Sequence, residues 1–132
     1  MHYVFGGICI LVHNKSMAYE VEFTDEFEQW WIGLSEGEQE SVAHGVRLLE
    51  NFGIRLTRPY ADTIAGSIYP NMRELRIQHE GRPYRVLYAF DPRRVSLLLF
   101  GGDKTGNSRW YEESVPKADA IFTRHLRSLE RE

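Results

Sequence analysis

Two arginines stand on neighbouring strand-like stretches of the sequence, one on each side of a short turn. Arg76 belongs to residues 72–78 and Arg85 to residues 83–90, and Glu80-Gly81 marks the turn between them. Either of the two turn lengths that fit gives the same antiparallel register, which puts Arg76 directly opposite Arg85. Guanidinium groups bind phosphate through paired hydrogen bonds and stabilise charge that develops on it, so this pair predicts phosphate chemistry.

The residues around this pair decide whether it can bind a ligand, because like charges that face each other on a sheet repel unless an anion or an acid lies between them. The alternation of side chains along a strand puts Glu74 on the arginine face. A tight turn at Pro92-Arg93 places Phe100 opposite Arg85, and Lys104 joins the same face if its strand continues that far. The same residues also allow a structural interpretation, in which both arginines only pair with Glu74 and with other acids.

Two helices are expected before these strands. Thr24 is a good N-cap for the first helix, and Ser35 with Glu38 forms a capping box that opens the second, which ends at Gly53. The apolar positions of the first are Phe27, Trp30, Trp31 and Leu34, and those of the second are Val42, Val46, Leu49 and Phe52. This spacing predicts a helical hairpin with one apolar side that packs on the sheet.

The remaining segments complete the expected fold. Residues 19–23 alternate like a strand, residues 54–71 are irregular and rich in turn formers, and residues 94–100 form the third strand of a meander. A final helix carries the apolar stripe Ala118, Ile121, Phe122, His125, Leu126 and Leu129. The order β-α-α-β-β-β-α predicts an α+β domain, a small antiparallel sheet with the helical hairpin on one face and the arginines on the other, open face.

The first sixteen residues are set apart from this domain. Met17 directly precedes the first strand-like segment, so we expect residues 1–16 to be an N-terminal extension from an upstream start codon and residues 17–132 to be the single domain. A second interpretation stays open, in which the apolar stretch 3–12 adds a strand to a sheet edge. That stretch is too short to cross a membrane, and it lacks the basic start of a signal peptide.

Composition and charge limit the classes of site. The single cysteine, Cys9, cannot form an internal disulfide or, with five scattered histidines, a zinc cluster, so we expect no metal, no cofactor and a reducing, cytoplasmic environment. Net charge is −3, yet residues 17–54 carry nine acids and one base, whereas residues 55–109 carry ten bases and five acids. Because the basic part contains the predicted sheet, a local patch can still bind phosphates.

Several short runs form a recognisable pattern. They are Leu75-Arg76, Pro83-Tyr84-Arg85-Val86-Leu87-Tyr88, Leu99-Phe100-Gly101-Gly102-Asp103-Lys104 and Trp110-Tyr111. With these runs the chain resembles the RelE/ParE superfamily of type II toxin–antitoxin systems, in its HigB-like, phage-derived branch, over about residues 17–125. The resemblance implies a RelE/ParE-like fold and an mRNA interferase, an endoribonuclease that cleaves mRNA, often on the ribosome, by attack of the 2′-OH on the adjacent phosphate. It also implies a cognate antitoxin of helix-turn-helix type as partner, and no membrane.

The resemblance further implies roles for single residues. Arg85 matches the family's arginine at the scissile phosphate, and Tyr111 matches a tyrosine that stacks on or orients the substrate. Arg76 falls where the prototype has a lysine proposed as general base. The chain departs from the pattern at Glu74, which replaces a second lysine, and at Thr105, which replaces an arginine.

The general base is open at this stage, since an arginine is a poor base with a pKa above about 12. Glu74, His79 and Asp103 are the alternatives. The candidate catalytic residues are thus Glu74, Arg76, His79, Arg85, Lys104 and Tyr111. Two alternatives to RNA cleavage also stay open: a ParE-like inhibitor of DNA gyrase, and a catalytically decayed member of the fold that only binds protein.

Overall fold

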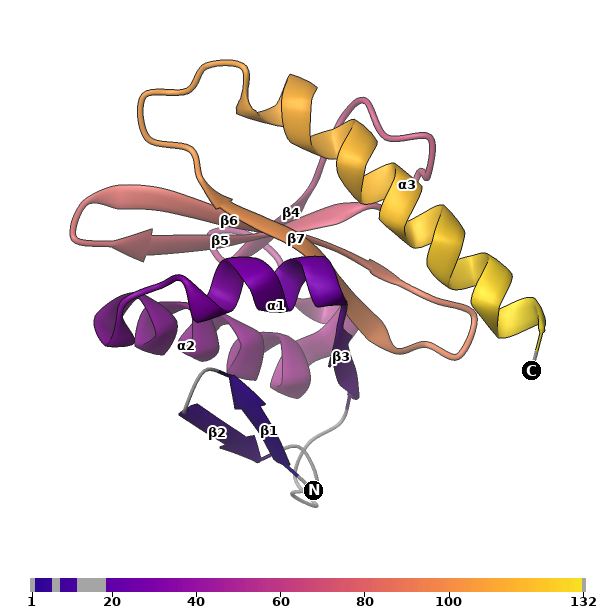
Figure 1. Cartoon of the computed structure of the whole chain (residues 1–132), viewed down its shortest axis with the longest axis horizontal. Coiled ribbons are helices and arrows are strands. Elements are labelled where there is room, and N and C mark those ends of the chain that lie inside the picture. The colour runs from indigo at the N-terminus through magenta and orange to yellow at the C-terminus, as the bar shows by residue number, and fades with distance from the viewer. Residues whose placement is uncertain (1, 6–7, 12–18, 132) are drawn as a thin grey trace.

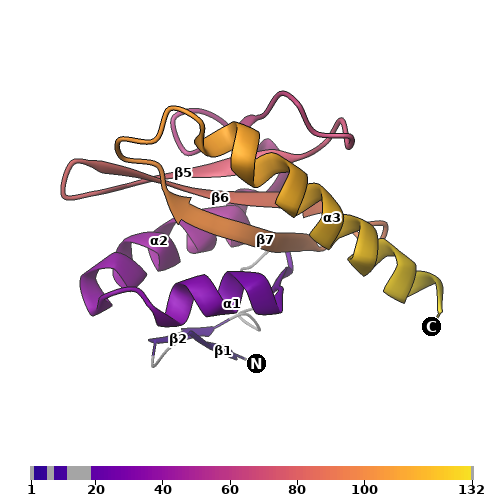
Figure 2. The ribbon, with the colours of Figure 1, turned by 45° about the horizontal axis from the view of Figure 1, so that its top comes forward.

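The architecture is a five-stranded sheet between two helical layers. A computed structural model describes residues 2–5, 8–11 and 19–131, and in it the sheet has the order β3-β7-β6-β5-β4. The strands are β3 (Val21–Phe23), β4 (Ala61–Thr63), β5 (Arg73–His79), β6 (Arg82–Phe90) and β7 (Ser96–Asp103), and the helices are α1 (Asp25–Ile32), α2 (Glu36–Phe52) and α3 (Trp110–Glu130). A short 3-10 helix, Gly53–Arg55, follows α2. Figures 1 and 2 show α1 and α2 on one side of the sheet and α3 on the other.

The expected α+β order and the helical hairpin are confirmed, and the caps explain where the helices begin. The Thr24 hydroxyl accepts a hydrogen bond from the backbone N–H of Phe27 at 3.1 Å. Ser35 and Glu38 exchange the two bonds of a capping box, at 3.2 and 2.8 Å. The apolar sides of both helices then meet one face of the sheet in a core that includes Phe27, Trp31, Val42, Val46, Leu49, Leu75, Val86 and Tyr88. None of the helices in the described part of the chain combines the length and hydrophobicity that a membrane crossing requires.

The predicted register of β5 and β6 is confirmed, since Arg76 pairs with Arg85. The next register is not as expected, because Gly102 lies opposite Arg85, and Phe100 lies opposite Leu87. One residue of the difference comes from a longer turn, in which the Asp91 carboxylate accepts two backbone N–H groups and Asp91 bonds back to Val95. The other comes from a bulge in the β6–β7 ladder next to Leu87.

One strand was missed in the segment 54–71, which the sequence predicted to be irregular. β4 is three residues long and pairs antiparallel with Arg73–Leu75 of β5, with Asp62 opposite Glu74. A strand this short carries too few residues to show an alternating pattern, and its polar Asp62 breaks the one it has. Its effect is to cover only the first part of the outer edge of β5.

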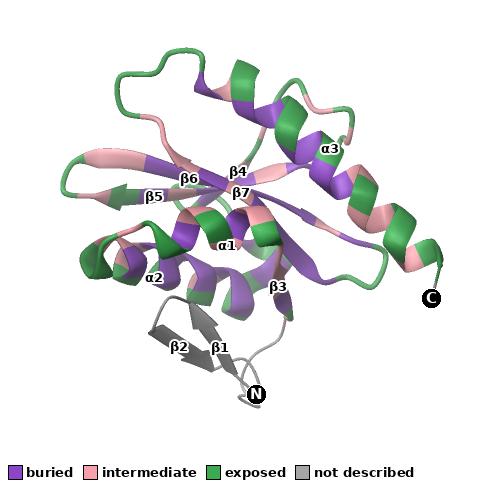
Figure 3. Cartoon of the chain, in the orientation of Figure 1, coloured by how far each residue is buried: buried purple, intermediate pink, exposed green. Residues whose placement is uncertain are grey.

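The face predicted to be open is in fact partly covered, because α3 packs on it. A second core joins α3 to this face and contains Met72, Leu87, Ala89, Leu97, Leu99, Trp110, Val115, Ala118, Ile121 and Phe122. Figure 3 shows the buried side of α3 turned toward the sheet. The predicted apolar stripe of the last helix therefore has its partner here, and α3 borders the arginine face.

The N-terminal segment forms a hairpin of its own. β1 (His2–Phe5) and β2 (Ile8–Leu11) pair antiparallel in a separate two-stranded sheet, so the described strands do not extend an edge of the main sheet. The residues around the proposed boundary at Met17 lie outside the described part of the chain. The division into residues 1–16 and 17–132 stays a prediction.

Glu50 is an acid inside the hydrophobic side of α2. Its residue surface is 1% exposed, and neither of its carboxylate oxygens has a hydrogen-bond partner among the described residues. Burial raises the pKa of the Glu50 carboxyl to about 7, against a smaller opposing effect of Arg47. Glu50 is therefore held in its neutral form in the folded protein at mildly acidic pH.

We expect stability to fall as the pH rises from about 4.5 to about 7, because the unfolded chain releases the Glu50 proton near the first value and the folded chain near the second. The loss is on the order of 3 kcal/mol and is complete above this window. The measurement is urea unfolding at several pH values. The Glu50→Gln variant should not show this loss, and at pH 8 it should be more stable than the parent. The exposed Glu36→Gln serves as control and should keep the decline; an equal decline in Glu50→Gln would assign it to other groups.

Candidate functional site

A buried carboxylate organises the arginine face beside α3. Glu74 is 4% exposed, and its Oε1 accepts the hydroxyl hydrogen of Tyr111 at 2.5 Å. Its Oε2 accepts from Nη1 of Arg76 at 2.9 Å, and Nε of Arg85 lies 3.4 Å from Oε1. The acid that the facing arginines required is thus Glu74, and it lies between them.

Arg85 is held from three directions. Its Nε donates to the Tyr111 hydroxyl oxygen at 3.2 Å, and its Nη1 donates to the backbone carbonyl of Tyr84 at 3.0 Å. The residue is only 4% exposed. Because a buried guanidinium is costly unless it is paired, these contacts fix its position, while Nη2 keeps no hydrogen-bond partner among the described residues. Arg85 can therefore offer a fixed donor to an anion.

Arg76 and Lys104 are more exposed than Arg85 and present charge on this face. The Arg76 side chain is 26% exposed, with Nη1 on Glu74. Lys104 continues the sheet past the end of β7 through its backbone N–H, which donates to the Pro83 carbonyl at 3.0 Å. Its Nζ lies 5.5 Å from the centre of the Tyr111 ring. The structure therefore brings together five of the six predicted residues, which we call the Glu74 cluster: Glu74, Arg76, Arg85, Lys104 and Tyr111.

Two glycines of β7 allow the aromatic residues to approach the sheet here. A Cβ at Gly102 would lie 2.5 Å from Nε1 of Trp110, and a Cβ at Gly101 would lie 2.2 Å from the ring of Trp30 on the opposite face. Only glycine leaves room for both indoles. Trp110 is the first residue of α3, so its contact with Gly102 places the first turn of the helix over the sheet. Tyr111, the next residue, then reaches Glu74.

Two of the candidate bases lie on the other face of the sheet, under the helical hairpin. They are His79, which is the sixth predicted residue, and Asp103. The His79 ring forms a hydrogen bond of 2.8 Å between Nδ1 and the Ser41 hydroxyl of α2. Asp103 pairs with Tyr84 in the sheet, and its carboxylate accepts from Arg82 at 3.3 Å and from the Thr105 backbone at 2.9 Å. Of the three candidate bases, only Glu74 lies in the cluster.

A further ion pair at the rim was not predicted. Arg58 donates through Nε to Asp62 of β4 at 2.7 Å, and Asp62 lies next to Glu74 in the β4–β5 ladder. The hydrogen bond from Arg58 lowers the pKa of the Asp62 carboxyl. Predicting this pair requires predicting β4, because that strand places Asp62 beside Glu74, and the sequence pattern does not predict β4.

Among the described residues, no group of three or more histidine, cysteine or acidic side chains could hold a metal ion.

The ionisation of Tyr111 reports on the cluster. Burial raises the pKa of the Tyr111 phenol, and the hydrogen bond to Glu74 raises it further, while Arg85 lowers it. Tyr111 therefore keeps its proton at neutral pH and stays a donor to the carboxylate.

We expect Glu74→Gln to lower the pKa of Tyr111, because the charge that opposes the phenolate is removed while Arg85 remains. The measurement is a pH titration of tyrosines labelled with ¹³C at Cζ, with Tyr111→Phe to identify the signal. Glu38→Gln is the matched control, since Glu38 accepts a hydrogen bond from Tyr84, whose pKa burial and this bond raise to about 12. It should lower the pKa of Tyr84 and leave Tyr111 unchanged. An unchanged Tyr111 pKa in Glu74→Gln would contradict the described geometry.

Comparisons with known proteins identify relatives of the chain. The family described as "Phage derived protein Gp49-like (DUF891)" matches residues 29–123, a range that contains the whole Glu74 cluster. Two proteins of Mycobacterium tuberculosis (strain ATCC 25618 / H37Rv) are similar. "Putative toxin HigB2" is 35% identical over 127 residues, which cover 92% of this chain and 63% of that protein. "Putative toxin HigB3" is 43% identical over 95 residues, which cover 71% of this chain and 82% of that protein.

These matches confirm the resemblance to the HigB-like, phage-derived branch. The chain spans less than two thirds of the length of the first of these relatives. No solved structure gives a significant match.

Proposed function

The chain belongs to the phage-derived Gp49-like family, and on this premise we propose that it is the toxin of a toxin–antitoxin system and that it cleaves mRNA. The toxin assignment is supported by the names of the two mycobacterial relatives. It entails a cognate antitoxin as partner, of helix-turn-helix type by the resemblance. The cleavage assignment entails RNA bound in the cytoplasm, free or on the ribosome, and it is supported by the site.

One observation carries this proposal: a carboxylate, a phenol and three cations meet on one face of the sheet. Arg76 and Lys104 are accessible enough to contact a phosphate from the solvent side, and Arg85 is fixed below them. Such preorganised cations are suited to the charge that develops on phosphate oxygens in a transition state. Glu74 and Tyr111 supply an acceptor and a donor of protons beside them.

These groups suffice for attack of the ribose 2′-OH on the adjacent phosphorus. The 2′-oxygen forms a bond to phosphorus as the bond to the 5′-oxygen breaks, which leaves a 2′,3′-cyclic phosphate and a 5′-hydroxyl. Glu74 accepts the proton of the 2′-OH, and Tyr111 donates a proton to the departing 5′-oxygen. The hydrogen bond that joins Tyr111 and Glu74 then returns the proton and restores both groups. In this role Glu74 is the general base in place of an arginine.

We expect Arg85→Ala to relieve growth arrest when the chain is expressed without a partner, and to reduce RNA cleavage by about 100- to 1000-fold, because a fixed donor to the phosphate is lost. The measurements are growth after induction and mapping of RNA ends. Arg82→Ala is the matched control, since Arg82 is on the same strand but its guanidinium lies over the Tyr84 ring on the other face. It should keep both activities.

Growth arrest with intact transcripts and with DNA breaks would contradict RNA cleavage and favour inhibition of gyrase. Soluble, folded protein that causes no arrest would favour a decayed member of the fold.

We expect Glu74→Gln to reduce the rate of RNA cleavage by about 100- to 10,000-fold while RNA binding stays the same or becomes tighter. The amide keeps the shape of the side chain but accepts a proton poorly, and it leaves the arginines without their internal anion. Single-turnover cleavage and fluorescence anisotropy with an uncleavable RNA separate the two effects. Asp103→Asn, which alters an excluded candidate on the other face of the sheet, should cleave normally; full activity in Glu74→Gln would rule out Glu74 as the base.

A further inference from the structure

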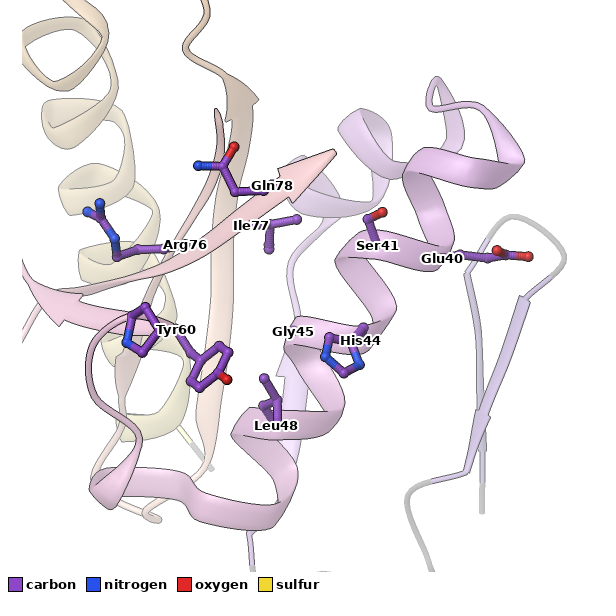
Figure 4. Close-up of a pocket in the computed structure, with 10 residues that line it drawn as sticks. Glu40, Ser41, His44, Gly45, Leu48, Tyr60, Arg76, Ile77 and Gln78 are labelled. Carbon is purple, nitrogen blue, oxygen red and sulfur yellow. The ribbon is translucent and has the colours of Figure 1, made fainter. Parts of the chain in front are cut away.

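A cavity of about 490 Å³ lies between α2 and the outer edge of β5. Figure 4 shows its walls: Ser41, His44 and Leu48 from α2, Ile77 from β5, and Tyr60 from the segment before β4. Gly45 lets the helix come close to the strand, because a Cβ there would lie 3.1 Å from Ile77. The cavity has the size of a small-ligand site, and no residue of the Glu74 cluster except Arg76 lines it.

The backbone of β5 opens toward this cavity. The Arg76 N–H points outward, since it donates to the Tyr60 carbonyl at 2.8 Å. Two residues further along, the Gln78 backbone must point the same way, and none of the described strands borders this stretch, since β4 pairs only with Arg73–Leu75. One backbone donor and one acceptor of Gln78 are thus available at the edge of the cavity.

The walls suit a flat aromatic ligand. Tyr60 is 48% exposed as a residue, an unusual exposure for a large aromatic residue at a cavity. Ile77 and Leu48 supply apolar contact opposite it, and the Ser41 hydroxyl is held in place by His79. Stacking on an aromatic ring with hydrogen bonds at the ligand's edge is how proteins commonly bind single-stranded RNA bases.

We propose that this cavity binds a nucleobase of the RNA whose phosphate is bound by the Glu74 cluster, an inference that rests on the proposed function. Arg76 connects the two sites: its backbone lines the cavity at the strand edge, and its guanidinium contacts Glu74. A nucleotide chain that crosses the edge of β5 brings its phosphate to one side and an extruded base to the other. The Gln78 backbone then pairs with the polar edge of the base while Tyr60 stacks on its face.

An extended peptide is the other ligand that a free strand edge could take. The free edge is too short to favour a peptide. It begins after Arg76, whose N–H bonds to Tyr60, and ends at the turn Glu80-Gly81, and in this stretch only Gln78 points its backbone outward. A single residue gives one donor and one acceptor, which match the edge of one base and not a strand. The shared Arg76 also places the cavity next to a phosphate site.

The test uses the full chain and 2′-O-methyl hexa-adenylate, which cannot be cleaved because its 2′-oxygens are blocked, together with a series in which one base at a time is missing. Binding is followed by fluorescence anisotropy. We expect one abasic position to weaken binding about tenfold, and Tyr60→Ala to weaken the intact oligomer by a similar factor. Tyr60→Ala should leave the affinity for that abasic oligomer unchanged. Ile68→Ala, at an exposed apolar residue outside the cavity, is the matched control and should bind like the parent.

Equal weakening of intact and abasic oligomers by Tyr60→Ala, or no weakening of either, would overturn the nucleobase site. If Arg85→Ala still reduces cleavage of an unmodified RNA in that case, the proposed function stands without the nucleobase site. If Arg85→Ala cleaves RNA like the parent, the proposed function itself fails. Loss of antitoxin binding in Tyr60→Ala with unchanged RNA binding would assign the cavity to a polypeptide and overturn the nucleobase site.

Discussion

The contacts of Glu74 with Arg76, Arg85 and Tyr111 hold together the strands and the helix that form the site. Two arginines face each other across β5 and β6, and one of them is almost fully buried. Such a pair is tolerated only when a carboxylate lies between the guanidinium groups and further bonds fix them. Glu74 does this, and its bond to Tyr111 also ties α3 to the sheet. The chemistry and the packing of this face therefore depend on one side chain.

The same constraint explains why a glutamate suits position 74 better than the lysine that the resemblance gives to the RelE prototype. A lysine there would add a third cation beside two that already repel, and α3 would lose the acceptor for Tyr111. With glutamate, two guanidinium groups flank one carboxylate and Lys104 lies over the Tyr111 ring, so the cluster stays positive and still contains an acceptor for a proton. In the proposed mechanism this glutamate is the general base.

The predictable part of the structure is local. The caps at Thr24 and Ser35 and the pairing of Arg76 with Arg85 follow from short-range rules, because a tight turn fixes a register and a side-chain oxygen fixes a helix start. The errors arise where tertiary contacts decide. Because of a bulge and a longer turn, Phe100 lies opposite Leu87 and not opposite Arg85 as expected. An alternating sequence pattern contains no signal that predicts a bulge. The position of α3, which buries the site, could not be predicted either. The sequence shows an apolar stripe on α3 and apolar positions on the strands, but it does not show that the two pack together.

The layers also explain how a chain with net charge −3 can present a site for an anion. Most of the acidic segment 17–54 lies in the edge strand β3 and in the helices α1 and α2, and the two helices cover one face of the sheet, whereas the basic residues belong largely to the sheet and its turns. The sheet thus separates two regions of opposite charge, and we expect a polyanion to be repelled from the helical hairpin and attracted to the arginine face beside α3. The cavity at the edge of β5 lies where these regions meet. There the apolar side of α2 and the uncharged backbone of Gln78 suit the base of a nucleotide, while the cations one strand position away suit its phosphate.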